Sequence, residues 1–256
     1  MIKHFIGLDI GSTYTKTAVI NENKELLQLV FKPTGWNGAE TAEQVRQELA
    51  DKGIDLAEAK IIATGYGRVS VPFAQKCVTE ITCHGKGAAF VYGKPNLTII
   101  DIGGQDTKII QVLDGAVNDF VMNDKCSAGT GRFLEVMAKT LSVDIAQLCD
   151  LASQGGNTSI SSMCTVFAES EVISLIGRGE KRENIAFAVV DSIVKKVASQ
   201  AKRMITPGSF LCLTGGLSES QYLLNALSKE LRTPIASHPH GRYAGAIGAA
   251  LLALNL

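Results

Sequence analysis

Two stretches of this sequence match each other, Asp9-Ile-Gly-Ser-Thr-Tyr-Thr-Lys16 and Asp101-Ile-Gly-Gly-Gln-Asp-Thr-Lys108. They share Asp, Ile, Gly, Thr and Lys at equivalent positions. Each follows an apolar run and precedes a β-branched one, which predicts a strand, an acidic glycine turn and a second strand, that is, a β-hairpin. Glycine turns offer backbone N–H groups to phosphates, and aspartates can hold the accompanying Mg²⁺. The repetition therefore predicts two copies of one subdomain that face a shared cleft.

The elements around the two hairpins also repeat. The first hairpin is followed by a strand over 26–32, a helix over 40–52, a strand over 61–64 and a helix over 81–91. After the second hairpin we expect a strand at 119–122, helices over 132–141, 144–154, 166–176 and 184–205, a strand at 210–213, and helices over 222–231 and 244–254. Such a succession predicts an α/β fold in two lobes, 1–95 and 96–256. The helix at about 244–254 could pack back on the first lobe.

The net charge, the length of the apolar runs and the position of the first strand exclude several classes of protein. The 256 residues carry a formal net charge of zero, whereas a nucleic-acid surface needs a basic excess. No apolar run approaches the length of a membrane span. The first strand begins almost at Met1, which leaves no room for a signal peptide. We therefore expect a cytoplasmic protein that binds neither nucleic acid nor membranes.

The six cysteines are not arranged for a local metal site, because no two of them form a C-x-x-C pair. A disulfide framework is not expected in a cytoplasmic chain. The default expectation for each is a small, buried, apolar residue. Cys126 and Cys164 differ in lying in turns that precede predicted helices, and spacing alone makes them two unpaired thiols.

Two further glycine turns strengthen the prediction of a nucleotide site. Leu213-Thr-Gly-Gly-Leu217 follows a strand and precedes a helix, and Gly129-Thr-Gly131 also opens a helix. Glycines allow a ligand to approach the backbone closely, and a helix start favours an anion. Ligands in such sheets sit at the carboxyl ends of strands, where all these turns lie.

At this level of detail the sequence resembles the actin, Hsp70 and sugar-kinase ATPase superfamily. The resemblance rests on the two hairpins, the Thr214-Gly-Gly216 turn and the closing Ala244-Gly-Ala-Ile-Gly-Ala249 segment. Longer strings narrow it: Ala63-Thr-Gly-Tyr-Gly-Arg68, Glu80-Ile-Thr-Cys-His84, the segment 121–135 and Cys164-Thr-Val-Phe-Ala-Glu-Ser-Glu171. Together they are similar to the activators of 2-hydroxyacyl-CoA dehydratases, in the BadF/BadG/BcrA/BcrD-type ATPase family that also includes ATPase subunits of benzoyl-CoA reductase.

The resemblance implies an ATPase coupled to one-electron transfer. The family protein is a homodimer that holds one [4Fe-4S] cluster between its subunits, and by motif its ligands here are Cys126 and Cys164 of each chain. A two-fold axis doubles each ligand, so two cysteines per chain complete a Cys₄ site. Helix starts after both cysteines would favour the reduced cluster. Ferredoxin or flavodoxin supplies the electron, and a 2-hydroxyacyl-CoA dehydratase-like partner or a related reductase component receives it. An interface cluster is expected to be oxygen-sensitive.

The resemblance and the turns together assign roles in the nucleotide cleft. Asp9 and Asp101 are predicted to lie near Mg²⁺, and Gln105 to orient the attacking water or sense the terminal phosphate. Contacts to ATP or ADP are predicted for Gly11, Ser12, Thr13, Lys16, Gly103, Gly104, Gln105, Gly129, Gly131, Gly215 and Gly216. For Lys16 and Lys108 a structural or solvated role is equally open. Glu169 and Glu171 are either helix-start charges or neighbours of the nucleotide.

One departure from the family and two alternative functions remain. After Gly216 the family pattern continues Val-Ala-Lys-Asn, whereas this chain has Leu217-Ser-Glu-Ser220, which puts the base contacts in doubt. A small-molecule kinase of the same fold is one alternative, although no insertion for a sugar substrate is evident. A nucleotide-gated assembly module like a filament protein is the other. Neither gives a reason for the strings around Cys126 and Cys164.

Overall fold

The chain folds into two compact units in a computed structural model that describes residues 3–161, 164–206 and 208–256. The first unit comprises Met1–Leu97, Gln111–Asp119 and His240–Leu256, and the second comprises Thr98–Ile110 and Phe120–Pro239. The sequence suggested one division, at 95/96. Residues 111–119 belong to the first unit because Val112 and Val117 lie against Gly85, where an added Cβ would meet both side chains.

The first unit is built on a five-stranded sheet with the order β3-β2-β1-β4-β5. β1 (Phe5–Ile10) and β2 (Tyr14–Ile20) form the predicted hairpin, and β3 (Leu26–Pro33) continues it antiparallel. β4 (Lys60–Thr64) and β5 (Lys76–Cys77) add to the other side in parallel. Every residue of β1 is buried, as expected of a central strand covered on both faces.

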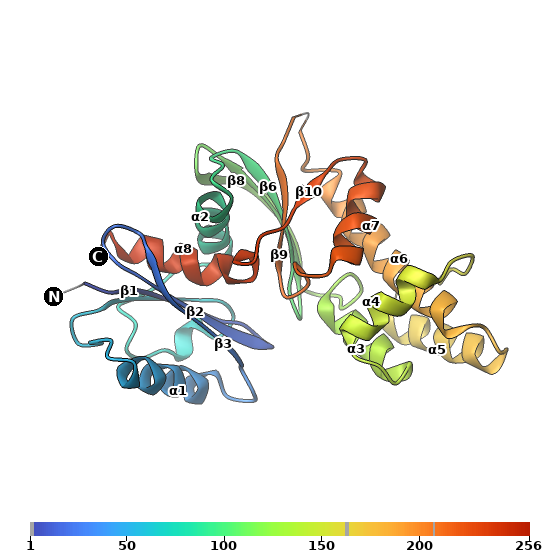
Figure 1. Ribbon diagram of the computed structural model, residues 1–256, viewed down its shortest axis with the longest axis horizontal. Coiled ribbons are helices and arrows are strands. Elements are labelled where there is room, and N and C mark those ends of the chain that lie inside the picture. Colours follow the sequence, from blue (N-terminus) through green and yellow to red (C-terminus); the bar gives the residue numbers. More distant parts are fainter. Residues whose placement is uncertain (1–2, 162–163, 207) are drawn as a thin grey trace. The chain divides into compact units, whose positions relative to one another are not determined.

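Helices cover both faces of this sheet (Figure 1). α1 (Gly38–Asp51) lies on one face, where Val45 and Leu49 pack with Ile6, Leu8 and Ile10. α8 (Ala244–Ala253) lies on the other face beside α2 (Glu80–Tyr92), and its residues pack with Phe5, Ala18 and Ile62. The last helix thus completes the core of the unit that contains the first strand.

Glycines let α2 and α8 approach backbone to backbone. A Cβ added at Gly87 would collide with the carbonyl oxygen of Ala244, and one at Gly248 with the carbonyl oxygen of Cys83. Gly7 of β1 is restricted in the same way by the carbonyl oxygen of Ala246. Because the colliding atoms are backbone atoms, no side chain can move aside, and this packing requires glycine.

The second sheet has the order β10-β9-β6-β7-β8. β6 (Leu97–Ile102) and β7 (Thr107–Leu113) flank the second repeat of the motif, and β8 (Ala116–Asn123) follows. β9 (Leu211–Gly215) pairs with β6 in parallel, and β10 (Ile235–Ala236) pairs with β9 in parallel. Its helices are α3 (Gly131–Thr140), α4 (Ile145–Gln154), α5 (Thr165–Gly177), α6 (Arg182–Ala201) and α7 (Gln221–Leu231). Residues of all five helices share one core with β6, β7 and β9.

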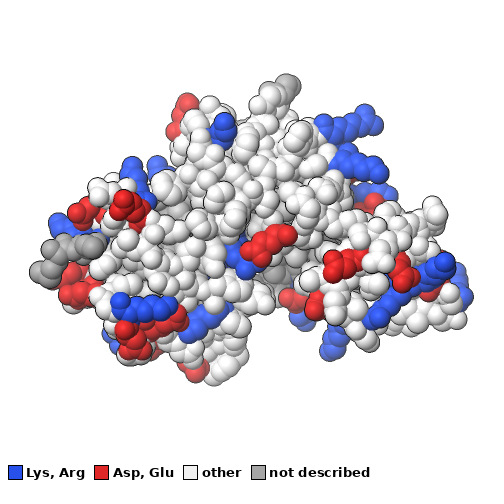
Figure 2. Space-filling model, in the orientation of Figure 1, with Lys and Arg blue, Asp and Glu red and all other residues white. Residues whose placement is uncertain are grey.

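The predicted helices and longer strands are present, and two short edge strands were missed. β5 and β10 have two residues each, too few to show a period of two. The face shown in Figure 2 carries acidic and basic side chains in mixed small groups, as the zero net charge would suggest. Among the described residues no helix combines the length and apolar character that a membrane crossing requires.

Candidate nucleotide and cluster sites

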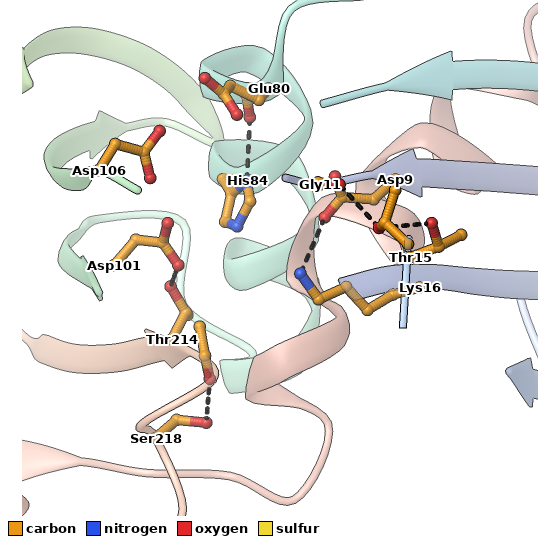
Figure 3. Close-up of polar contacts among 12 residues, drawn as sticks. Asp9, Gly11, Thr15, Lys16, Glu80, His84, Asp101, Asp106, Thr214 and Ser218 are labelled. Atoms are coloured by element: carbon orange, nitrogen blue, oxygen red, sulfur yellow. Dashed lines mark hydrogen bonds and ion pairs between the residues drawn. The ribbon is translucent and has the colours of Figure 1, made fainter. Parts of the chain in front are cut away.

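Asp9 lies near the end of the central strand of the first unit and is 4% exposed. The hairpin register places Lys16 opposite it, and Lys16 Nζ is 3.9 Å from Asp9 Oδ2 (Figure 3). The lysine side chain is 16% exposed, so it is partly accessible to solvent. The pairing explains why Asp and Lys recur together in the motif: seven residues apart, they meet across one hairpin.

Two glycines leave room for the Asp9 carboxylate. A Cβ added at Gly65 would lie 2.5 Å from Asp9 Oδ1, and one at Gly245 would lie 2.7 Å from Oδ2. Gly65 also has φ of +84°, a conformation that side chains disfavour. His84 borders the Gly245 position and shares a 3.1 Å hydrogen bond between its Nδ1 and the Glu80 carbonyl oxygen. The absence of a side chain at both glycines therefore leaves space for the carboxylate on two sides.

The turn of the first hairpin is tied down by backbone contacts. The N–H of Gly11 donates to the Tyr14 carbonyl oxygen at 3.2 Å, and Thr34 Oγ1 donates to the Gly11 carbonyl oxygen at 2.7 Å. The N–H of Thr34 donates to the Thr13 carbonyl oxygen at 2.9 Å. Ser12 at the tip is exposed and Thr13 is half-buried. This hydrogen-bonded turn leaves the side chain of Ser12 exposed.

Asp101 is the counterpart of Asp9 in the second unit and is 2% exposed. Its Oδ1 accepts a 2.8 Å hydrogen bond from Thr214 Oγ1 (Figure 3). Its Oδ2 is 3.4 Å from Lys108 Nζ, which is also 2.7 Å from Oδ2 of Asp106. Lys108 is therefore buried between two carboxylates, which does not fit the solvated role among those that the sequence left open.

The two units repeat this arrangement more fully than the sequence suggested. β1 pairs with β4 so that Asp9 lies beside Thr64, and β6 pairs with β9 so that Asp101 lies beside Thr214. The next residues, Gly65 and Gly215, both have φ of +84° and lie against their unit's aspartate. Sequence reasoning missed Gly65 as a site residue. A signal existed, since Thr-Gly follows a buried strand in both halves.

The predicted glycines of the second unit fall into two groups. Gly103 and Gly104 lie against the start of α3, because the N–H groups of Gly131 and Arg132 donate to their carbonyl oxygens at 2.9 and 2.8 Å. The carbonyl oxygen of Gly129 accepts from Thr107 Oγ1 at 2.5 Å. The first N–H groups of α3 are thus bonded to the hairpin. Gln105, between the glycines and Asp106, is exposed.

Gly215 and Gly216 lie after β9, and their surroundings account for the departure from the family pattern. Ser218 Oγ donates to the Gly215 carbonyl oxygen at 2.9 Å, and Ser220 caps α7 by accepting from the Leu223 N–H. A Cβ added at Gly216 would meet nothing within 4 Å. The unusual serines therefore close the turn and start the helix, and they leave the backbone at Gly216 open.

A cavity of about 390 Å³ lies in the second unit beside Gly129. It is lined by Ala128, Gly129, Phe133, Ile160, Ser161, Ser192, Lys195, Lys196, Ser199, Gln200 and Arg203. Its three basic residues, Lys195, Lys196 and Arg203, lie on α6 or just after it. Lys195 Nζ is paired with Asp191 Oδ2 at 2.7 Å. Of the residues predicted to contact the nucleotide or its Mg²⁺, Gly129 lines this cavity. Gly215, Gly216 and Asp101 do not line it.

The two predicted cluster ligands lie on neighbouring loops of the second unit. Cys126 and Cys164 are both exposed. The residues that follow them, Ser127 and Thr165, share a 2.7 Å hydrogen bond between their hydroxyl groups. Asn123 Nδ2 donates to the carbonyl oxygens of Cys126 and Ala128 at 2.9 and 3.0 Å, which fixes the first loop. The two cysteines, 38 residues apart in sequence, therefore lie on exposed loops that a hydrogen bond joins.

The two helix starts near these cysteines are not equivalent. Cys164 is the N-cap of α5, and its carbonyl oxygen accepts from the Ala168 N–H at 2.9 Å. By contrast, α3 begins five residues after Cys126, and its first N–H groups bond to the second hairpin. The first N–H groups of α3 are therefore bonded within the second unit, whereas α5 begins directly after Cys164.

The acidic residues of α5 hold the surrounding structure. Glu171 accepts from the N–H and hydroxyl of Ser161, at 3.1 and 3.2 Å, just before Cys164 in the chain. Glu169 accepts from Thr140 Oγ1 of α3 at 3.1 Å. These contacts tie α5 to α3 and to Ser161.

The other four cysteines do not all follow the default expectation. Cys83, Cys149 and Cys212 are buried, but Cys77 is exposed, so that prediction was wrong for Cys77. It lies on β5, the two-residue strand at the edge of the first sheet. Burial raises the pKa of the Cys83 thiol to about 12 and raises the pKa of Cys149 and Cys212 as well. These three are neutral at physiological pH.

Comparison with known proteins identifies the family. The sequence matches the BadF/BadG/BcrA/BcrD ATPase family over residues 6–253. The chain belongs to this family. The (R)-2-hydroxyglutaryl-CoA dehydratase activating ATPase of Acidaminococcus fermentans is 41% identical over 254 residues, covering 97% of this chain and 96% of that one. The predicted family is therefore confirmed.

Solved structures of family activators agree. The crystal structure of the A. fermentans dehydratase component A matches this BadF/BadG/BcrA/BcrD ATPase with a TM-score of 0.91 and 38% identity, over 98% of both chains. The activator of 2-hydroxyisocaproyl-CoA dehydratase from Clostridium difficile, with bound ADPNP, matches with a TM-score of 0.89 and 36% identity, over 98% of this chain and 94% of that one. A ROK family glucokinase from Streptomyces griseus, at 16% identity and a TM-score of 0.64, shares the fold alone. The predicted actin-like α/β fold class is confirmed.

Proposed function

We propose that this protein is an ATP-dependent one-electron donor that activates a 2-hydroxyacyl-CoA dehydratase-like enzyme. Membership of an ATPase family and the similarity to dehydratase activators support the ATP-dependent activator role. The observation that carries the electron-transfer part is the pair of exposed thiols, Cys126 and Cys164, on loops joined by the Ser127–Thr165 hydrogen bond.

The thiols suit a [4Fe-4S] cluster shared between two copies of the chain. Such a cluster takes four thiolates, and when bound it carries one electron at a time. The described part of the chain holds no group of three or more His, Cys, Asp or Glu placed to bind a metal. In this proposal Cys126 and Cys164 supply two ligands per chain, and a two-fold partner supplies the other two. The N-terminus of α5, which begins at Cys164 without a side-chain cap among the described residues, favours added negative charge, that is, the reduced state.

Exposed apolar residues next to Cys164 support the homodimer. Val166 and Phe167 are each 67% exposed, and Ile173 and Ile176 follow on α5 at 55% and 45%. Val166, Ile173 and Ile176 recur at spacings that share one helix face. A second copy seated on this face would bury these side chains and bring four thiols together.

The two hairpins are proposed to bind ATP and ADP with Mg²⁺. Mg²⁺ is commonly held by one or two carboxylates together with substrate phosphates and water, and Asp9 and Asp101 are suitable carboxylates. The ammonium of the partly exposed Lys16 side chain would contact a phosphate oxygen, and the exposed Ser12 would donate to another. Gln105, exposed beside Gly104, would orient the attacking water.

The coupling requires the nucleotide states to differ in affinity for a partner or in cluster potential, because a ligand shifts only equilibria whose states it binds unequally. In this proposal ferredoxin or flavodoxin reduces the protein, ATP binding and hydrolysis drive the change of state, and one electron passes to the dehydratase-like partner. Each electron transferred is matched by one lost from the donor.

Iron analysis tests the proposal. The protein is purified without oxygen, and iron and acid-labile sulfide are measured for the parent and for Cys126→Ala, Cys164→Ala and Cys77→Ala. We expect about four of each per dimer in the parent and in Cys77→Ala, whose exposed thiol lies in the other unit, and loss in the other two variants. An anaerobic, reconstituted parent without iron would refute the electron-transfer role and bring the small-molecule kinase of the same fold to the front.

A further inference from the structure

The charges around the two motif aspartates differ, although the motif is duplicated. In the first hairpin, Lys16 lies 3.9 Å from Asp9, and the position equivalent to Asp106 holds Tyr14, which is 39% exposed. In the second hairpin, Lys108 contacts both Asp101 and Asp106, and all three side chains are 3–4% exposed. One hairpin therefore balances its carboxylate with one lysine, whereas the other buries two carboxylates against one lysine.

The lysine of the second hairpin is shared unequally. Lys108 Nζ is 2.7 Å from Asp106 Oδ2 and 3.4 Å from Asp101 Oδ2. The longer contact satisfies hydrogen-bond geometry, whereas the shorter one is an ion pair in which Asp106 Oδ2 has no aligned donor among the described residues. Because Coulomb attraction rises as distance falls, Asp106 takes the larger share of the ammonium charge.

Asp101 is fixed on its other side. Thr214 Oγ1 donates to its Oδ1 at 2.8 Å, and Gly215 lies beside that oxygen, since an added Cβ would lie 2.9 Å away. The carboxylate cannot turn to a new partner without losing the threonine. How much negative charge Asp101 presents therefore depends in part on where the Lys108 ammonium lies.

We propose that Asp106 is a positioning residue that holds the Lys108 ammonium back from Asp101, so that Asp101 remains available to the Mg²⁺ that accompanies the nucleotide. The proposal rests on the proposed nucleotide function. Without Asp106, Lys108 has Asp101 as its remaining carboxylate in this triad and neutralises it. With Asp106, the triad keeps one excess negative charge in a buried place, which a divalent cation offsets. None of the site roles assigned above from the sequence includes Asp106.

The test measures how ADP binding depends on Mg²⁺. Isothermal titration calorimetry of ADP at a series of Mg²⁺ concentrations gives the half-saturating Mg²⁺ for the parent, Asp106→Asn, Lys108→Met and the double variant. Glu230→Gln is the matched control, because it removes a carboxylate from an exposed 2.8 Å ion pair with Lys202 in the same unit. ADP avoids turnover, so the readout does not depend on catalysis.

We expect Asp106→Asn to raise the half-saturating Mg²⁺ roughly tenfold or more, because it leaves the ammonium to neutralise Asp101. The double variant is expected to return to near the parent value, because the competing ammonium is gone. Lys108→Met alone should lower the half-saturating Mg²⁺, and Glu230→Gln should leave it unchanged. Recovery in the double variant would also exclude misfolding as the cause of the single variant's defect.

Two results would overturn the inference while the proposed function stands: an Asp106→Asn protein with parental Mg²⁺ dependence, or a double variant as defective as Asp106→Asn. A parent that binds no ADP at any Mg²⁺ concentration would refute the proposed nucleotide function, and this inference with it. The two failures are therefore distinguishable by the parent alone.

Discussion

Gly245→Ala tests whether the space around Asp9 matters as the structure suggests. The added Cβ would lie 2.7 Å from Asp9 Oδ2 and 2.9 Å from His84 Cε1, whereas comfortable contacts between heavy atoms are about 3.5–4.0 Å. Overpacking of this kind costs about 1–3 kcal/mol, and the better helix propensity of alanine returns up to about 1 kcal/mol. We therefore expect a net loss of only about 0–2 kcal/mol in the free energy of unfolding.

The effect on function is expected to be larger than the effect on stability. To relieve the contact, the Asp9 carboxylate must move by several tenths of an ångström or more, away from the position set by Gly65 and Lys16. Misplacement by about 1 Å can reduce a catalysed rate about a hundredfold. We expect ATP hydrolysis to fall at least tenfold at saturating ATP, measured together with urea unfolding.

Gly156→Ala is the matched control, because an added Cβ there meets nothing within 4 Å and its φ is not in the left-handed region. It should gain about 0.4–1 kcal/mol of stability and keep full activity. Parental hydrolysis by Gly245→Ala, with the same affinity for ATP, would refute the reasoning that Asp9 must occupy this position.

Three further predictions concern stability and access. Burial raises the pKa of Cys83 to about 12, so above about pH 9 the unfolded thiol ionises while the folded one stays protonated. The free energy of unfolding should therefore fall as the pH rises from about 9 toward 12, by up to about 1.4 kcal/mol per pH unit. Cys83→Ala should flatten this slope in urea unfolding at about pH 8–10.5. Parallel slopes would contradict it. Asp144→Ala removes the capping box of α4 and should cost about 0.5–2 kcal/mol, whereas Asp150→Ala within the same helix should cost less; equal losses on thermal unfolding would argue against the cap. Alkylation of the iron-free native protein should label Cys77, Cys126 and Cys164 well before Cys83, Cys149 and Cys212, and peptide mapping that finds Cys212 labelled as fast as Cys77 would disprove the assigned burial.

The repeated motif allowed much of the fold to be predicted. Asp and Lys seven residues apart with glycine between them fit a tight hairpin, and buried β-branched runs on both sides fit central strands. The same local logic found the longer helices, because their apolar residues recur at helical spacing. It could not find β5 and β10, whose two residues are defined by a neighbouring strand and not by their own pattern.

The site was less fully predictable, because its geometry depends on residues distant in sequence. Gly65 and Gly245 belong to the site because they lie against Asp9, and neither contact can be predicted from local spacing. Asp106 occupies the position of Tyr14 in the first repeat, so the comparison of repeats hides it. The proximity of Cys126 and Cys164 likewise depends on the Ser127–Thr165 contact across 38 residues.

The return of α8 to the first unit has a consequence for the order in which the protein can fold as it is made. Residues 98–110 and 120–239 must be synthesised before Ile247, Ala250 and Leu251 can cover Phe5, Ala18 and Ile62. Chains emerge from the ribosome N-terminus first, and their domains generally fold as units. Here the second unit is complete in sequence while one face of the first sheet is still bare. The lobe that is begun first is therefore finished last, and a nascent chain depends on its final helix to hide an apolar sheet face.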